Sequence, residues 1–437
     1  MMVTAIYNTA DTFFVSQLGT SASGAVGIIF SLMALIQAGG FMIGMGSGSI
    51  TSRALGAKDM KTASKYCSTA LCSAFTLGLI FAVFGTIFNR QLVTCLGATP
   101  TILPYAMDYA RYIILASPFM ITAFVMNNQL RFQGKAAFSM IGMVSGGILN
   151  MLLDPLFIFV FKMGISGAAI ATLVSQITSF SILLSMFIRK KSTAELSLKN
   201  VSREIKTYFD IITTGLPSLF RQGMASVSGI VMNISAAKYG AMLTGFALTT
   251  AQTADAAVAG MSITNRIFML LLSVAIGLGQ GFQPVCGMNL GAKKYDRVKA
   301  ANRFLIKVTS VIMAVFGLGV FIFAPEIARS FRDDPAVIAV ATVAMRFQAC
   351  VLPFHSLIFG TNMLLQVAGV KKSATILSSM RQGIIFVPLI LILPQLVQLF
   401  GAEPLLGVQM TQTFSDLLSS LIALPFMLRF FRKLEKE

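Results

Sequence analysis

The chain has 437 residues, of which 56% are hydrophobic and 11% are charged. Soluble domains carry about 25% charged residues, so this composition excludes a soluble globular protein and favours a membrane protein. The net charge of +18 lies mostly in loops between apolar stretches. That distribution excludes a nucleic-acid-binding surface and leaves the lipid bilayer as the expected partner.

Apolar stretches long enough to cross the bilayer recur along the whole chain. A helix needs roughly 20 residues to cross about 30 Å of hydrocarbon, and strand-like alternation of polar and apolar residues is absent. We therefore predict an all-α membrane protein with twelve spans, at residues 1–17, 25–50, 66–88, 106–130, 138–161, 166–188, 208–238, 254–285, 304–324, 338–367, 373–396 and 404–428. The first span is short for a crossing, so we expect helix 1 to be truncated and about 30 further N-terminal residues to complete it.

The basic residues indicate the topology of the chain. Most lysines and arginines lie at the C-terminus and in alternate loops, after the second, fourth, sixth, eighth and tenth spans. This asymmetry is the positive-inside pattern. We therefore expect a multi-pass protein of the cytoplasmic membrane whose basic loops and C-terminus face the cytoplasm.

The two halves of the chain repeat one pattern. The run IGMGSG at residues 43–48, with LGAK at 55–58, returns as IGLGQG at 276–281, with LGAK at 290–293. Two copies of one membrane bundle are how many secondary transporters build a central cavity. Further residues return after a constant offset: Pro100, Pro118, Asn127 and Gly134 match Pro335, Pro353, Asn362 and Gly369.

The repeat defines the expected domains. Each copy has six helices, an even number, so the copies enter the membrane from the same side as parallel repeats. We expect an N-terminal six-helix lobe at residues 1–188, a cytoplasmic inter-lobe linker at 189–206 and a C-terminal six-helix lobe at 207–437. The polar linker is either irregular or an amphipathic surface helix.

Two acidic residues lie within the predicted spans of the first lobe. Asp11 and Asp154 each follow a polar residue by four positions. The phenol of Tyr7 and the amide of Asn150 therefore lie on the same helix face as the acid. A carboxylate inside a membrane costs about 2.5 to 3.5 kcal/mol on insertion scales and is by default a functional candidate. Neither acid returns in the second copy, so we interpret both as ion-binding groups; the structural alternative is a helix–helix hydrogen bond or, beside Pro155, a helix cap.

Other polar residues inside the spans are weaker candidates. Asp255 and Asp416 are acids of the second lobe, and we rank them below the first pair. The cysteines show no metal-ligand spacing, so we expect no metal centre and no cofactor. Six further residues are candidates either for a substrate cavity or for interhelical hydrogen bonds: Asn127, Asn128, Asn265, Arg266, Gln283 and His355.

Three stretches of the chain resemble the multidrug and toxic compound extrusion (MATE) transporters, and best their bacterial DinF-like branch. They are YNTADTFFVSQLGTSASGAVG, NMLLDPLFIF with GISGAAIAT after it, and ITNRIFMLLLSVAIGLGQGFQPVCGMNLGAKKYDRV. The resemblance implies two six-helix lobes around a central cavity, which rock between inward-open and outward-open states. It also implies an ion site in the first lobe, formed by Asp11, Asn150 and Asp154 with Tyr7 and Thr172 in support.

These residues and this resemblance predict a transporter and not an enzyme. We expect a monomeric, cation-coupled antiporter that exports amphipathic, mostly cationic organic compounds. A proton is the expected coupling ion. Binding of sodium at Asp11, Asn150 and Asp154 is the alternative that we leave open, because carboxylates with amide and hydroxyl neighbours suit both ions.

Two alternatives follow from other features of the sequence. A lipid-linked glycan flippase of a related two-lobed fold would need a basic cavity for its anionic cargo, and Arg221, Arg266 and Arg346 keep that alternative open. An intramembrane enzyme would need a nucleophile, a base or a metal cluster. One histidine and dispersed cysteines argue against it.

Overall fold

The structure is a computed structural model that describes residues 14–15, 17–243 and 249–435. Within those residues the chain is helical and contains no strand. Ten of the described helices are long and apolar enough to cross a membrane. The prediction of an all-α, multi-pass membrane protein is thereby confirmed, while most of the first predicted span lies outside the described residues.

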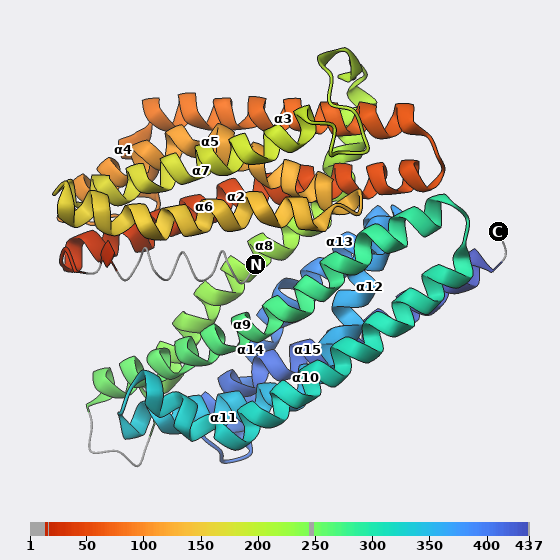
Figure 1. Cartoon of the computed structure of the whole chain (residues 1–437). Helices are drawn as coiled ribbons and strands as arrows, with labels where there is room; N and C mark the ends of the chain where they lie inside the picture. Colours follow the sequence, from red (N-terminus) through yellow and green to blue (C-terminus); the bar gives the residue numbers. More distant parts are fainter. Residues whose placement is uncertain (1–13, 16, 244–248, 436–437) are drawn as a thin grey trace. The chain divides into compact units, whose positions relative to one another are not determined.

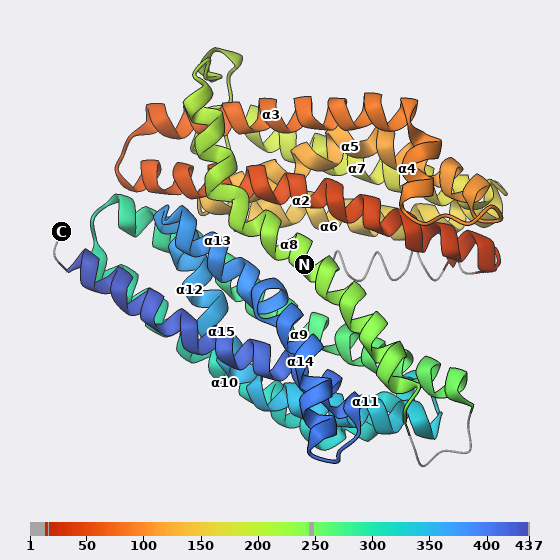
Figure 2. The same ribbon diagram turned by 180° about the vertical axis from the view of Figure 1, so that it is seen from behind.

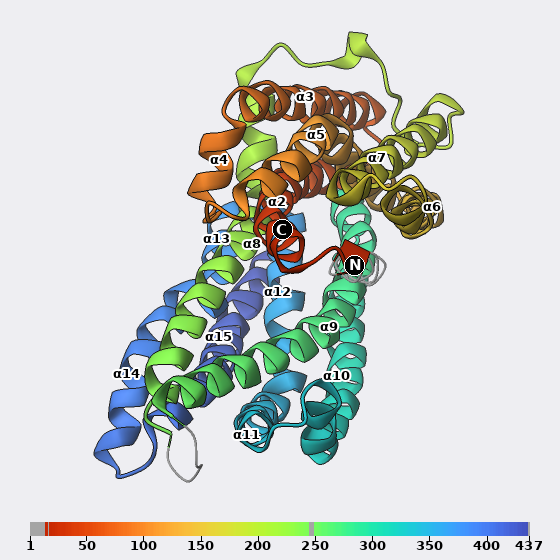
Figure 3. The same cartoon turned by 90° about the vertical axis from the view of Figure 1, so that its left-hand side faces the viewer.

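The chain forms two compact units. The first comprises residues 1–219 together with 287–293. Its long helices run side by side in Figures 1 and 2 and are seen roughly end-on in Figure 3. They are α2 (Thr20–Gly56), α3 (Met60–Ile87), the short α4 (Asn89–Cys95), α5 (Leu103–Phe132), α6 (Ala136–Pro155) and α7 (Gly164–Ile188), with the π-helix η1 (Leu156–Val160) after α6 and the 3-10 turn η2 (Leu198–Asn200) after α7.

The second unit comprises residues 220–286 together with 294–437. The chain enters it within α8 (Ile205–Gly240), which has 36 residues and is not among the ten apolar candidates. The expected lobe boundaries at 188 and 206 stay predictions. The remaining helices are α9 (Thr250–Gly291), α10 (Tyr295–Phe331), α11 (Pro335–Val351), η3 (Leu352–Phe354), α12 (His355–Ala368), α13 (Lys371–Ser379), η4 (Met380–Ile384), α14 (Phe386–Leu399) and α15 (Pro404–Leu434).

The repeat in the sequence is also a repeat of contacts. In the first unit, the amide of Asn127 on α5 donates to the carbonyl oxygen of Ser139 on α6 at 2.9 Å. In the second, Asn362 on α12 donates to the carbonyl oxygen of Ala374 on α13 at 2.8 Å. Both bonds join residues twelve positions apart, so matched asparagines tie matched helices together.

The repeated LGAK runs end two long helices in the same way. Lys58 after α2 has a φ of 61° and Lys293 after α9 has a φ of 56°, both in the left-handed region that often ends a helix. The glycines of the two runs lie where backbones approach closely. A Cβ on Gly56 would lie 2.0 Å from the carbonyl oxygen of Met288, and one on Gly291 would lie 1.9 Å from that of Arg53. Both positions therefore require glycine.

The predicted linker is largely irregular. Its regular pieces are the three-residue η2 and residues 205–206, which begin α8, so the amphipathic surface helix that we left open does not form. The carboxamide oxygen of Gln133 at the end of α5 accepts hydrogen bonds from Ser192 Oγ and from the backbone N–H groups of Thr193 and Ala194, at 2.7, 2.7 and 3.1 Å. These bonds hold the beginning of the linker on the first unit.

Candidate ion-binding site

Three polar side chains that the sequence singled out meet between α6 and α7. The amide nitrogen of Asn150 lies 3.2 Å from Asp154 Oδ1 and 3.4 Å from Thr172 Oγ1, and it donates to both. All three side chains are buried, and Asp154 is 0% exposed. The structure thus brings Asn150, Asp154 and Thr172 together as one cluster in the first unit.

Local sequence explains why these groups converge. Asn150 and Asp154 are four residues apart, so they lie on successive turns of one face of α6. Small residues let α7 approach that face, because a Cβ on Gly146 would lie 2.9 Å from the Cβ of Ser179. Pro155 follows the acid directly and has no N–H to donate, and the chain continues as the π-helix η1. Single-turn π segments of this kind are frequent at functional sites.

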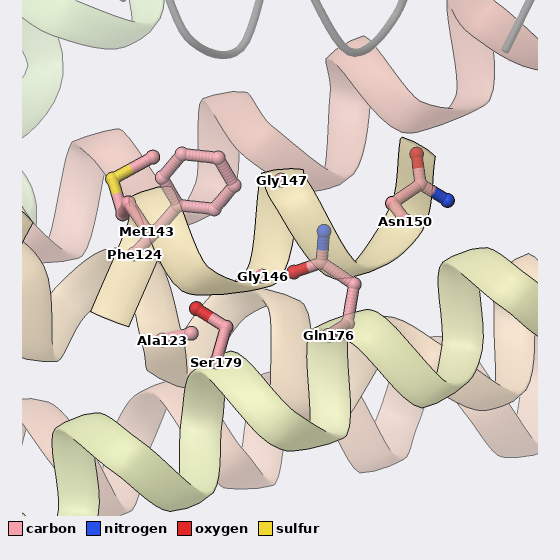
Figure 4. A pocket seen from close by; sticks show the side chains of 8 residues that line it. All are labelled: Ala123, Phe124, Met143, Gly146, Gly147, Asn150, Gln176 and Ser179. Atoms are coloured by element: carbon pink, nitrogen blue, oxygen red, sulfur yellow. The ribbon is translucent and has the colours of Figure 1, made fainter. Parts of the chain in front are cut away.

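A small cavity opens beside Asn150. It has a volume of about 30 Å³ and is lined by Ala123, Phe124, Met143, Gly146, Gly147, Asn150, Gln176 and Ser179. Figure 4 shows Gln176 and Ser179 reaching from α7 toward the glycines of α6. The carboxamide oxygen of Asn150 finds no hydrogen-bond partner among the described residues. Since a water needs roughly 10 to 15 Å³, the space suits a water or a small ion and is too small for a drug.

Two expected members of the site lie outside the described residues. Tyr7 and Asp11 are both in the segment 1–13, so their place beside Asp154 stays a prediction. Sequence reasoning also missed Gln176, which lines the cavity. The signal was present, because Gln176 follows Thr172 by four residues and therefore shares its helix face.

The six candidates for a substrate cavity are divided between the two units, and Asn127 and Asn128 belong to the first. Asn127 ties α5 to α6, and Asn128 donates to the carbonyl oxygen of Phe124 at 2.7 Å and also bonds Arg131. These bonds fit the interhelical alternative for Asn127, whose match Asn362 makes the same bond.

The other four candidates belong to the second unit. The side chains of Asn265 and Arg266 are exposed on α9, and Gln283 is buried with its amide 3.5 Å from Gln366 Oε1. His355 is buried and lies against Asp416. Whether any of the six lines a substrate cavity stays a prediction.

A second buried acid emerges in the second unit. Asp416 on α15 is 2% exposed and accepts from Arg381 Nε at 2.6 Å and from Gln412 Nε2 at 2.8 Å. Sequence reasoning ranked Asp416 low and did not pair it with Arg381. Two opposite charges in neighbouring spans were the available signal, since intramembrane charges usually pair.

The comparisons with known proteins agree with this architecture. The chain belongs to the MatE family, whose family model matches residues 1–156 and 217–392. The predicted MATE membership is therefore confirmed, and the protein is a transporter rather than an enzyme; its assignment to the DinF-like branch stays a prediction.

Curated relatives match almost the whole chain. The multidrug export protein MepA of Staphylococcus haemolyticus is 29% identical over 401 residues, which cover 92% of this chain and 85% of that protein. MepA of Staphylococcus aureus strain MRSA252 is 26% identical over the same shares. The similarity thus extends over both units.

Solved structures share the fold. A MOP superfamily transporter from Pyrococcus furiosus, for which a reversed polarity of the binding pocket suggests a different function, matches with a TM-score of 0.89 at 25% identity. A multidrug resistance MATE transporter in an outward-facing conformation matches with a TM-score of 0.89 at 26% identity. Each alignment covers 100% of this chain and 94% of the other.

Proposed function

We propose that this protein is a multidrug efflux transporter that expels amphipathic, mostly cationic organic compounds in exchange for a cation. Two considerations support the proposal: family membership, and the multidrug export proteins among relatives that match 92% of the chain. The positive-inside pattern supports a cell-membrane location with the basic loops and the C-terminus in the cytoplasm. The substrate is a small molecule, and the protein acts as a monomer.

The observation that carries the coupling mechanism is the cluster of Asp154, Asn150 and Thr172. Asp154 is a fully buried acid in a span, and Asn150 offers it a neutral amide donor at 3.2 Å. A buried carboxylate favours whichever cation neutralises it, so proton uptake and binding of an organic cation compete. We expect a proton to bind Asp154 and Asn150 to orient it.

Protonation changes both the charge and the packing of the site. Loss of the negative charge weakens attraction for a cationic substrate, which favours its release. Protonation of Asp154 also changes the hydrogen bond that it accepts from Asn150. Because Asn150 donates to Thr172 as well, this changes the contact between α6 and α7. The small cavity beside Asn150 supplies room for a water or a small ion on this path. Tyr7 and Asp11 complete the site in this proposal.

A liposome assay with separately imposed gradients tests the proposal. Wild-type protein is expected to move a cationic dye under a pH gradient, and Asp154→Asn is expected to reduce that flux to the level of empty liposomes. Asp108→Asn is the matched control, because Asp108 is an exposed acid on α5 of the same unit. Dye export by Asp154→Asn at the wild-type rate would contradict the role of Asp154. Dependence on a sodium gradient alone would assign the site to sodium.

A lipid-linked glycan flippase stays the alternative to this proposal. It would need basic side chains directed into one cavity, for which Arg221 on α8, Arg266 on α9 and Arg346 on α11 were the candidates. Arg346 Nε donates to the carbonyl oxygen of Phe321 at 3.3 Å, and its guanidinium lies over the Phe321 ring. No observation on the described residues favours a flippase over a drug exporter, so we put forward no second function.

A further inference from the structure

The first unit contains a second cavity, which is larger than the one beside Asn150 and shares no lining residue with it. It has a volume of about 220 Å³ and lies among α2, α3, α4 and α5. Its lining residues are leucines, isoleucines and phenylalanines, apart from Gly85 on α3 and Ser117 on α5. The coupling mechanism proposed above uses none of them.

The side chains that line this cavity are either apolar or already satisfied. Ser117 is buried, and its hydroxyl donates to the carbonyl oxygens of Gly78 and Ile114 at 2.9 and 2.7 Å. A Cβ on Gly85 would lie 2.8 Å from Ile114 Cγ2, so glycine at this position lets α3 pack closely against α5 at the base of the cavity. Apolar cavities of about 150 Å³ stay dry and bind benzene, so this space suits hydrocarbon and not water.

The mouth of the cavity is formed by exposed apolar side chains. Leu35 on α2 is 53% exposed and Phe84 on α3 is 57% exposed, whereas Ile36 and Ile114 at the base are 1% and 2% exposed. Both α2 and α3 are long and apolar enough to cross a membrane. Hydrocarbon is the solvent around such helices, so an acyl chain can enter the cavity from its mouth.

The short helix α4 closes one end of the cavity. It packs against α5 and α3 at the end of the first unit that faces the viewer in Figure 3. The amide of Asn89 donates to the carbonyl oxygen of Met107 at 3.1 Å, and Val93 is fully buried. Helix α4 follows one span and precedes the next, so it lies at the level where spans end and lipid headgroups begin.

Helix α4 also brings a cation close to the cavity. Phe88 and Leu92 line the cavity and are four residues apart, so they share one side of α4. Arg90 lies between them in the sequence and is exposed. It forms no ion pair with any residue that the structure describes. An apolar cavity with an exposed guanidinium beside its end matches an amphiphile whose head is an anion.

We propose that this cavity binds one acyl chain of an anionic membrane lipid, whose phosphate contacts Arg90. Charge selects this occupant, because a guanidinium attracts a phosphate and repels an organic cation. Position agrees with charge, because a lipid phosphate lies where spans end and its chains extend along the spans. The proposal is independent of the proposed function, since it requires neither a drug nor transport.

The chain contains no tryptophan, which makes a direct contact experiment practical. Phe84→Trp introduces one fluorophore at the mouth, and Val83→Trp introduces one at the neighbouring exposed position, which does not line the cavity. Each variant is placed in vesicles that mix phosphatidylcholine with phosphatidylglycerol, with quenching bromines on the chains of one lipid at a time. At position 84 we expect a preference for phosphatidylglycerol of about fivefold, the contribution of one basic residue near an anionic lipid surface. At position 83 we expect no preference.

Further variants assign the preference to Arg90. Arg90→Gln should abolish it, and Lys162→Gln, which removes another exposed cation of the same unit, should leave it unchanged. Equal quenching by the two lipids at position 84 would overturn the proposal. Loss of quenching when a cationic dye is added would also overturn it, because the cavity would then take a drug. If Phe84→Trp does not fold, Phe88→Trp reports from the same cavity with the same expectations.

Discussion

In each unit, the described residues include a buried aspartate that accepts a hydrogen bond from an amide one helical turn earlier, yet the surroundings of the two carboxylates differ. Asn150 donates to Asp154 at 3.2 Å, and Gln412 donates to Asp416 at 2.8 Å. Asp416 additionally binds the Arg381 guanidinium and faces His355. Asn150, the amide partner of Asp154, also donates to the neutral hydroxyl of Thr172. A small cavity lies beside Asn150.

The difference teaches how the same residue type serves two purposes. A carboxylate held by a fixed guanidinium already has its charge compensated, so it favours structure and has little need of a mobile cation. Asp154 accepts a hydrogen bond from the neutral amide of Asn150, and a small cavity lies beside that amide. Asp154 is therefore the carboxylate that we propose for the coupling ion, whereas Asp416 is held in an ion pair with Arg381.

The largest effect on stability is expected from a substitution that breaks the ion pair between Arg381 and Asp416 in the second unit. Arg381→Met leaves Asp416 buried without its guanidinium, and loss of one partner of a buried pair costs about 3 to 5 kcal/mol of unfolding free energy. The double variant Arg381→Met with Asp416→Leu should recover most of that loss, because neither charge then remains. Chemical unfolding in detergent measures both. A loss below about 1 kcal/mol in the single variant, the range of exposed pairs, would show that Asp416 is not held as described.

A smaller effect is expected from the amide of the first unit. Asn150→Leu removes the donor that serves both Asp154 and Thr172, and loss of such a donor costs about 1 to 3 kcal/mol. Drug transport in liposomes should fall together with stability. Gln176→Leu is the control, because Gln176 lines the same cavity without bridging Asp154 to Thr172. Equal losses in both variants would indicate that cavity polarity matters and the bridge does not.

The smallest expected effect lies in the linker. The ammonium of Lys65 donates to Glu204 at 2.8 Å and lowers the pKa of that exposed carboxyl. Because the folded-state pKa is below the unfolded value, the contribution to stability is present above the unfolded pKa and is lost as the pH falls through the folded pKa. Glu204→Gln should therefore lower the melting temperature slightly at neutral pH and not at strongly acidic pH. A difference that persists unchanged into acid would contradict the ion pair.

Much of the fold followed from the sequence because its signals are local or repeated. Apolar length predicted the spans, and the repeated Asn127 and Asn362 make matching bonds in the two units. The pair of Asn150 and Asp154 followed from helical spacing alone. The resemblance to MATE transporters, rather than spacing, singled out Thr172, which the structure places at hydrogen-bonding distance from Asn150.

The remaining features depend on contacts that no local pattern encodes. The bond between Arg381 and Asp416 joins residues 35 positions apart in separate helical segments. Sequence analysis left open whether the linker forms a helix. In the structure, Gln133 at the end of α5 binds the linker backbone, and this contact joins separate segments of the chain. The cavity beside Asn150 depends on how closely α7 approaches the glycines of α6, which side-chain packing determines.

The most direct test of the central claim measures protons released when a drug binds. Purified wild-type protein in weakly buffered detergent solution is mixed with a cationic dye, while dye binding and the pH are followed together. If the organic cation displaces a proton from Asp154, the wild type releases protons on binding and Asp154→Asn binds the dye without releasing them. Equal proton release by the two proteins would contradict the claim that Asp154 carries the coupling ion.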